Sequence, residues 1–101
     1  MKLFVDDKRK KPEDEMMTKV KTFGMATTLM KVQKYEFVSL DYDLGENQPT
    51  GLDILKWMHE NERYPEHINI HSDHPEGKPE MVKYIKENFP KEVSLTLNSA
   101  I

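Results

Sequence analysis

Short apolar runs recur along the chain and are separated by longer, more polar stretches. They predict five β-strands, around residues 3–5, 17–22, 37–40, 68–70 and 93–97. The runs Leu3–Val5 and Phe37–Leu40 are almost uninterrupted, which is typical of central strands that are buried on both faces of a parallel sheet. The last run alternates apolar residues with Ser94 and Thr96, which indicates an edge strand with one wetter face.

Between these runs the apolar spacing changes to the period of an α-helix. In residues 50–63 apolar side chains recur every three or four positions, and Thr50 with Asp53 forms a capping-box pattern at the start. The same period predicts helices over 79–89 and 23–32.

Strands that alternate with helices form right-handed βαβ units and a mostly parallel sheet. We therefore expect an α/β, flavodoxin-like fold: a five-stranded sheet with helices on both faces. The length of 101 residues fits a single domain over residues 1–101.

Composition narrows the class of protein. A formal net charge of -3 argues against general DNA binding, which depends on a basic face. The absence of cysteine excludes a thiolate zinc site and fits the cytoplasm, and no apolar run approaches the length of a membrane span. We expect a cytoplasmic protein with no membrane segment.

Two of the predicted strands end in acids. Asp6 and Asp7 follow the first strand, and Asp41 and Asp43 follow the third. In a sheet with strand order 2-1-3-4-5, these two strands are neighbours, roughly 4.8 Å apart, and their carboxyl ends form the usual ligand site. Repulsion within such a cluster is relieved by a protonated carboxyl or by a cation, and an oxygen-only site suits Mg²⁺, with Mn²⁺ as a substitute.

Four segments in order, "LFVDDKRKKP", "FVSLDYDLG", "TGLDILKWM" and "INIHSDHPEGKPEM", resemble the cyclic-phosphate-processing receiver-like domains and, more widely, response-regulator receivers. The resemblance implies that Asp6 and Asp7 are the acidic pair of the first strand and that Asp41 matches the acid that receivers phosphorylate. It also implies that Asp43 offers a backbone carbonyl to the metal and that Ser72 lies near the receiver's hydroxyl position. The family is expected to handle cyclic or terminal phosphates of nucleotides or RNA.

The chain departs from the receiver pattern in several places. The end of the last strand reads "LTLNSAI", without the receiver lysine, and we expect no final helix and only a reduced first helix. Tyr42 stands where the resemblance predicts histidine, and His74 where it predicts asparagine.

Further polar residues lie beside the acids. His71, at the end of the fourth strand, is either a hydrogen-bonded structural histidine or a general acid that protonates a leaving oxygen. Lys8 and Arg9 follow the first acidic pair and are assigned, with His74, to substrate binding. A zinc site is disfavoured because His67 and His71 on one strand lie roughly 13 Å apart.

Two functions fit these residues. The first is metal-dependent hydrolysis of a cyclic or terminal phosphate on a nucleotide or an RNA end, with Asp41, His71 and Ser72 as catalytic residues. The second is a non-catalytic receiver-like module that binds a phosphorylated ligand or a protein partner, for which its exposed final strand is available.

Overall fold

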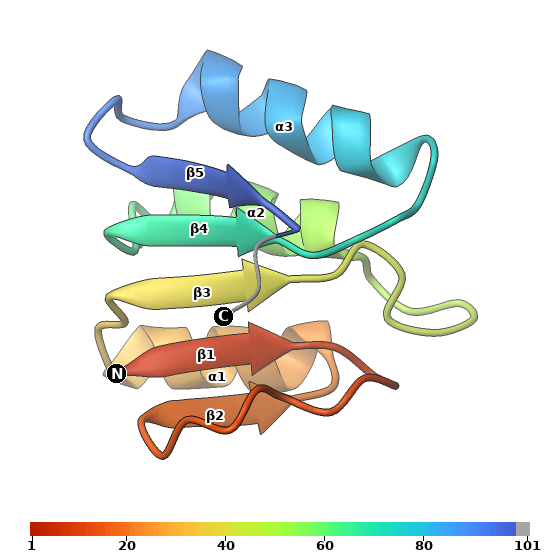
Figure 1. The fold of residues 1–101 in the computed structure, drawn as a ribbon. Coiled ribbons are helices and arrows are strands. Elements are labelled where there is room, and N and C mark those ends of the chain that lie inside the picture. The colour runs from red at the N-terminus through yellow and green to blue at the C-terminus, as the bar shows by residue number, and fades with distance from the viewer. Residues whose placement is uncertain (99–101) are drawn as a thin grey trace.

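The computed structural model describes residues 1–98, which form a five-stranded sheet in the order β2-β1-β3-β4-β5 (Figure 1). Every neighbouring pair of strands is parallel. The strands are β1 (Lys2–Val5), β2 (Met17–Val20), β3 (Phe37–Leu40), β4 (His67–Ile70) and β5 (Ser94–Leu97). The predicted flavodoxin-like sheet is confirmed, with β5 at one edge.

Three helices connect the strands: α1 (Phe23–Val32), α2 (Gly51–Glu60) and α3 (Gly77–Asn88). The capping box of α2 forms as predicted, since the Thr50 N–H donates to Asp53 Oδ2 at 2.8 Å and the Asp53 N–H donates to Thr50 Oγ1 at 3.4 Å. Within the described residues, no helix is long and apolar enough to cross a membrane.

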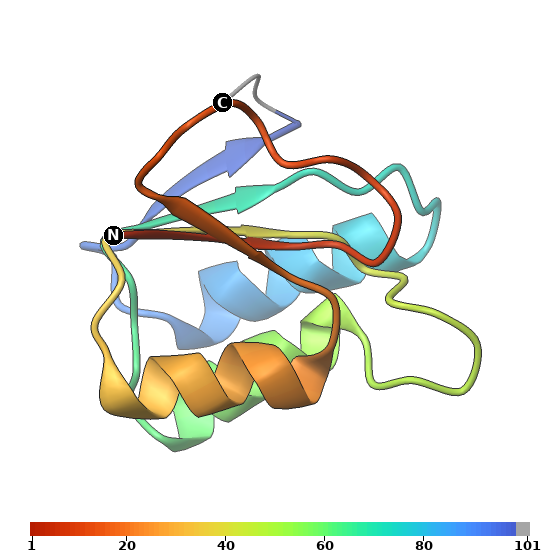
Figure 2. The same ribbon diagram turned by 90° about the horizontal axis from the view of Figure 1, so that it is seen from below.

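All three helices lie on one face of the sheet, whereas the sequence led us to expect helices on both faces (Figure 2). A helix on the second face would have to come from the β1–β2 connection or follow β5. The connection, residues 6–16, contains no helix; it carries Pro12 and a run of charged residues in place of an apolar stripe, and it lies across the second face. The predicted absence of a final helix concerns residues that lie outside the described part of the chain.

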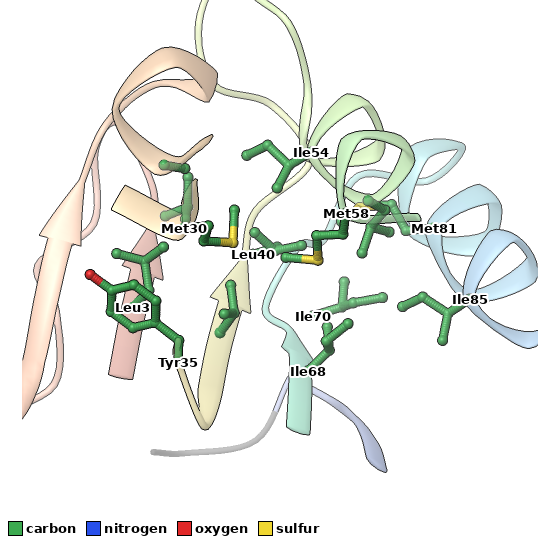
Figure 3. Close-up of a cluster of buried hydrophobic side chains, with 14 of the residues drawn as sticks. Leu3, Met30, Tyr35, Leu40, Ile54, Met58, Ile68, Ile70, Met81 and Ile85 are labelled. Atoms are coloured by element: carbon green, nitrogen blue, oxygen red, sulfur yellow. The ribbon is translucent and has the colours of Figure 1, made fainter. Parts of the chain in front are cut away.

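The apolar core fills the space between the sheet and the helices (Figure 3). Alternate residues of the central strands point into it, and so do side chains from all three helices, among them Leu3, Leu40, Ile68, Ile70, Met30, Ile54, Met58, Met81 and Ile85. Full burial of one such side chain stabilises the fold by roughly 1.5–3 kcal/mol. This packing fixes the sheet and therefore the positions of the residues that follow each strand.

The helix-free face of the sheet is more polar. Residues that pair across neighbouring strands point to the same side, so Phe4, Ser39, Asn69 and Thr96 form one row across this face. Phe4 is buried, and Ser39 and Asn69 are fully buried. Buried polar side chains need hydrogen-bond partners, and on this face they find them in one another.

Candidate functional site

Asp6, Asp41 and His71 come together where β1, β3 and β4 end. One potential ligand atom from each residue lies within 4.8 Å of the others. Each residue directly follows its strand, and its backbone N–H continues the parallel ladder: that of Asp41 donates to Val5 O at 3.1 Å, and that of His71 donates to Leu40 O at 3.0 Å. The carboxyl ends of the three strands therefore position the cluster.

Asp6 is fully buried and held on several sides. Its Oδ1 accepts hydrogen bonds from the backbone N–H groups of Lys8 at 2.8 Å and Arg9 at 2.9 Å, while its Oδ2 lies 3.0 Å from His71 Nε2. Burial raises the pKa of this carboxyl, but the hydrogen bonds from Arg9, Lys8 and His71 together outweigh burial, so the net shift of the pKa is downward. Asp6 is therefore an anchored carboxylate.

His71 is almost fully buried, with its ring stacked on Phe4 at a centroid distance of 4.5 Å. Its Nδ1 lies 2.6 Å from Ser39 Oγ and its Nε2 faces Asp6. Burial lowers the pKa of His71, and the hydrogen bond to Asp6 only partly offsets that effect. Both ring nitrogens have protein partners, so this geometry favours the structural interpretation of His71 over the general-acid interpretation.

Asp41 faces the same site, but the surroundings of its carboxyl group differ from those of Asp6. Its Oδ1 accepts a hydrogen bond from the Tyr42 N–H at 2.8 Å, and the Ser72 hydroxyl bonds to its carboxylate. Burial raises the pKa of Asp41, and the charge of Asp6 raises it further. The backbone of Asp41 also packs closely on α2, because a Cβ at Gly51 would lie 2.1 Å from Asp41 O.

Ser72 is the link between Asp41 and the β4–α3 connection. It is buried, and its Oγ accepts a hydrogen bond from the His74 N–H at 3.1 Å. The structure therefore places Ser72 at the site, in contact with Asp41.

The other two predicted metal ligands lie differently. Asp43 is exposed, and its side-chain Oδ1 accepts a hydrogen bond from the Gly45 N–H at 3.0 Å, as an aspartate in a turn does. That its backbone carbonyl binds the metal stays a prediction. The Asp7 side chain points toward the same turn. Its Oδ2 lies 3.6 Å from the position that a Cβ on Gly45 would occupy. Among the described residues, neither side chain joins the group formed by Asp6, Asp41 and His71.

Arg9 bridges two segments at the edge of the site. Its guanidinium donates hydrogen bonds to His71 O and to Asp73 Oδ2, the latter at 3.2 Å, and it lies 3.8 Å from Asp6 Oδ2. The side chain is 44% exposed. Arg9 is thus a half-exposed cation beside the carboxylates, and Lys8 next to it is exposed.

The two residues that depart from the family pattern contact each other. The rings of Tyr42 and His74 lie 4.6 Å apart, and His74 Nδ1 accepts a hydrogen bond from the Gly77 N–H at 2.8 Å, at the start of α3. A Cβ on Gly77 would lie 2.2 Å from the Tyr42 ring, so Tyr42 packs directly on this glycine. The His74 side chain therefore satisfies a backbone N–H in the first turn of α3, a role that its sequence position did not indicate.

Asn98 follows β5 at the place where the resemblance predicts a lysine. In the amide orientation that satisfies both of its ends, Asn98 donates hydrogen bonds to Ile70 O and Ser72 O, and accepts one from Lys78 Nζ at 2.7 Å. Lys78 belongs to α3, so an ammonium group reaches the end of β5 from a different element.

Ser39 and Asn69 are partners of the site that were not predicted from the sequence. Each interrupts an apolar run, and the two occupy paired positions of β3 and β4. Aligned polar residues in two buried strands were the signal that could have revealed them.

Comparison with protein families gives a match over most of the chain. The model described as "Cyclic-phosphate processing Receiver domain" matches residues 1–87, which include every residue of the site up to His74. No curated protein matches the chain.

Proposed function

Because the chain belongs to the family of cyclic-phosphate processing receiver domains, we propose that it hydrolyses a cyclic or terminal phosphate on a nucleotide or an RNA end with the help of a divalent cation. The observation that carries this proposal is the convergence of Asp6 and Asp41 beside His71. The family name supports phosphate chemistry in general, and the carboxylates support the metal.

The donor set fits a hard cation. Asp6 and Asp41 offer carboxylate oxygens, which Mg²⁺ and Mn²⁺ prefer, and Mg²⁺ is commonly held by one or two carboxylates with several waters retained. Burial and, after it, the charge of Asp6 raise the pKa of Asp41, so the ionised form of Asp41 is costly beside Asp6 and a cation between the two carboxylates would be stabilising. A bound Mg²⁺ supplies polarisation of a phosphoryl oxygen and a coordinated water of lowered pKa.

The chain's own residues then bind and orient the substrate. Of the cations beside the carboxylates, Arg9 is the best suited to bind a phosphate, because its planar guanidinium can pair with two phosphate oxygens. Among its present partners, the Asp73 carboxylate is 80% exposed, so exchanging this ion pair for a phosphate costs little. Lys8 adds positive charge, and Ser72 keeps the Asp41 carboxylate oriented. We assign His71 to positioning Asp6.

Turnover of cyclic nucleotides and of RNA ends with 2′,3′-cyclic phosphates, measured with and without Mg²⁺, tests this function. We expect metal-dependent hydrolysis that Asp41→Asn lowers by roughly 10²-fold or more. Asp43→Asn is the matched control, because it makes the same chemical change two positions away in a side chain outside the cluster. Equal activity of both variants would contradict the proposal.

A binding module without catalysis is the second candidate, and one observation favours it. Both nitrogens of His71 are engaged within the protein, so no histidine nitrogen of this cluster is directed toward a leaving oxygen. Metal-dependent binding of a cyclic phosphate by the parent protein, without any hydrolysis, would establish this function in place of the first.

A further inference from the structure

A chain of hydrogen bonds crosses the helix-free face of the sheet and ends at the candidate metal site. It joins, in order, His67, Thr96, Asn69, Ser39, His71 and Asp6. The five donor–acceptor distances are 2.8, 2.6, 3.1, 2.6 and 3.0 Å. The chain thus connects the edge strand β5 to the carboxylate that follows β1.

The register of the sheet places these side chains in contact. Ser39 pairs with Asn69, and Asn69 pairs with Thr96, so the three side chains stand side by side on one face. Ser39 and Asn69 are fully buried, so water does not compete for their hydrogen bonds. A buried chain of this kind is favourable only when each donor meets an acceptor.

The direction of the chain is set by the Asn69 amide in its middle. Its Nδ2 donates to Ser39 Oγ, and its Oδ1 accepts from the Thr96 hydroxyl. Because the Thr96 proton is used in this way, Thr96 Oγ1 accepts from His67 Nε2. Ser39 Oγ accepts from Asn69, and the Ser39 hydroxyl proton is buried and needs an acceptor of its own, which His71 Nδ1 provides at 2.6 Å.

The direction at Ser39 fixes the tautomer of His71. A neutral imidazole has one donor and one acceptor nitrogen, so an accepting Nδ1 places the ring proton on Nε2. That Nε2–H then donates to the Asp6 carboxylate, which only accepts when ionised. Each of the five hydrogen bonds therefore joins a donor to an acceptor, from His67 to Asp6.

We propose that Ser39 and Asn69 are positioning residues of the site, which hold His71 as the Nε2–H tautomer and thereby fix Asp6 beside Asp41. This inference rests on the proposed function, because it concerns the same metal site. It also assigns the site's chemistry: with its proton on Nε2, His71 is a hydrogen-bond donor to a carboxylate ligand and not a ligand itself. The site is then an oxygen site suited to Mg²⁺, and a zinc site using His71 is excluded while the chain keeps this direction.

The tautomer of His71 is measured directly by ¹⁵N NMR of the metal-free protein at about pH 8, where neutral imidazole dominates. His71 signals are identified by their loss in His71→Gln. We expect a pyrrole-type Nε2 and a pyridine-type Nδ1 for His71. The opposite pattern, with the proton on Nδ1, would overturn the inference.

Substitutions along the chain of hydrogen bonds test whether its residues far from Asp6 act on the site. Ser39→Ala removes the donor to His71 and should weaken Mg²⁺ binding about 10-fold, the lower end of what loss of an outer-shell partner costs. Thr96→Val, two strands away from Ser39, removes the group that orients Asn69 and should weaken Mg²⁺ binding less. Both variants should also mix the two tautomers of His71.

Thr27→Val is the matched control for Thr96→Val. Thr27 is a buried threonine on α1 that does not belong to the chain of hydrogen bonds. Its hydroxyl donates to Phe23 O at 2.9 Å. The control should lower stability comparably but leave the His71 tautomer and the Mg²⁺ affinity unchanged. If Ser39→Ala and Thr96→Val behave like Thr27→Val in both readouts, the residues are only structural and the inference fails.

The outcomes separate this inference from the proposed function. If the parent protein binds no Mg²⁺, the proposed function fails, while the tautomer in the metal-free protein and its response to Ser39→Ala still decide whether the chain positions His71. If the parent binds Mg²⁺ and hydrolyses a cyclic phosphate but the tautomer does not respond to Ser39→Ala, the function stands and the positioning role is overturned.

Discussion

Asp6 and Asp41 lie side by side after neighbouring strands, yet their pKa values shift in opposite directions. Burial raises both pKa values, but three hydrogen-bond donors around Asp6 reverse the shift there. At Asp41 the charge of Asp6 adds to the effect of burial. The site therefore pairs one carboxylate that is stabilised as an anion with one whose charge is costly, and the two should respond oppositely to charge removal.

Asp41→Asn should stabilise the metal-free protein by a few degrees in Tm at pH 7. The raised pKa means that the folded state binds the Asp41 proton more tightly than the unfolded state does, so ionised Asp41 lowers stability at pH values above the usual carboxyl range. Differential scanning calorimetry without metal checks this, with Asp43→Asn as the control. A lower Tm for Asp41→Asn than for the control would contradict the electrostatic account.

Asp6→Asn should destabilise the protein by about 1.5–3 kcal/mol at pH 7, because the hydrogen bonds from the Lys8 and Arg9 N–H groups lose their charge assistance and an amide NH2 group would face the His71 Nε2 donor. The depressed pKa of Asp6 means that its contribution is present above the pKa of the unfolded chain and disappears as the pH falls through the lower folded pKa. Urea unfolding of both proteins over an acid pH series measures the difference. A cost that stayed constant down to the lowest pH would argue against an ionised Asp6.

Gly51→Ala should destabilise the protein by about 1–3 kcal/mol and weaken Mg²⁺ binding. An added methyl group would overlap the Asp41 carbonyl and so push the β3–α2 connection outward. Gly24→Ala is the control, since a Cβ there meets only Thr22 Oγ1 at 4.0 Å, and a helix gains up to about 1 kcal/mol from alanine. Chemical unfolding and a Mg²⁺ titration of both variants provide the comparison; equal results would show that close packing on Asp41 is unimportant.

Arg9→Ala should chiefly weaken phosphate-ligand binding, by about 10-fold, and change kcat little. A guanidinium at the edge of the site meets the phosphate in the bound substrate and in the transition state alike, so its loss raises KM. Asp73→Asn releases the same guanidinium from its ion pair without removing it, and should leave affinity equal or higher. A drop in kcat with unchanged KM for Arg9→Ala would assign Arg9 to the chemical step.

Much of this fold follows from local patterns in the sequence. Continuous apolar runs around Leu3 and Phe37 mark the central strands, and the order of strands follows from the rules for parallel sheets. The meeting of Asp6 with Asp41 follows from that order, because both residues directly follow their strands. The absence of a helix on the second face could also have been predicted, because residues 6–16 carry no helical apolar stripe.

Side-chain direction within turns could not be predicted in this way. Asp7 and Asp43 each lie beyond the last ladder position, where neither strand nor helix period sets orientation, and both turn toward Gly45. The partners of His71 depend on residues far away in the sequence: Ser39 and Asp6 are separated from it by 32 and 65 positions. Only the register of the finished sheet brings these three together.

A divalent cation shared by Asp6 and Asp41 can be located by adding Mn²⁺ to the ¹⁵N-labelled protein and mapping paramagnetic broadening of its amide signals. We expect broadening that is centred on the residues after β1, β3 and β4, is reversed by excess Mg²⁺, and is lost in Asp41→Asn but kept in Asp43→Asn. Broadening centred on exposed acids elsewhere, or unchanged in Asp41→Asn, would contradict it.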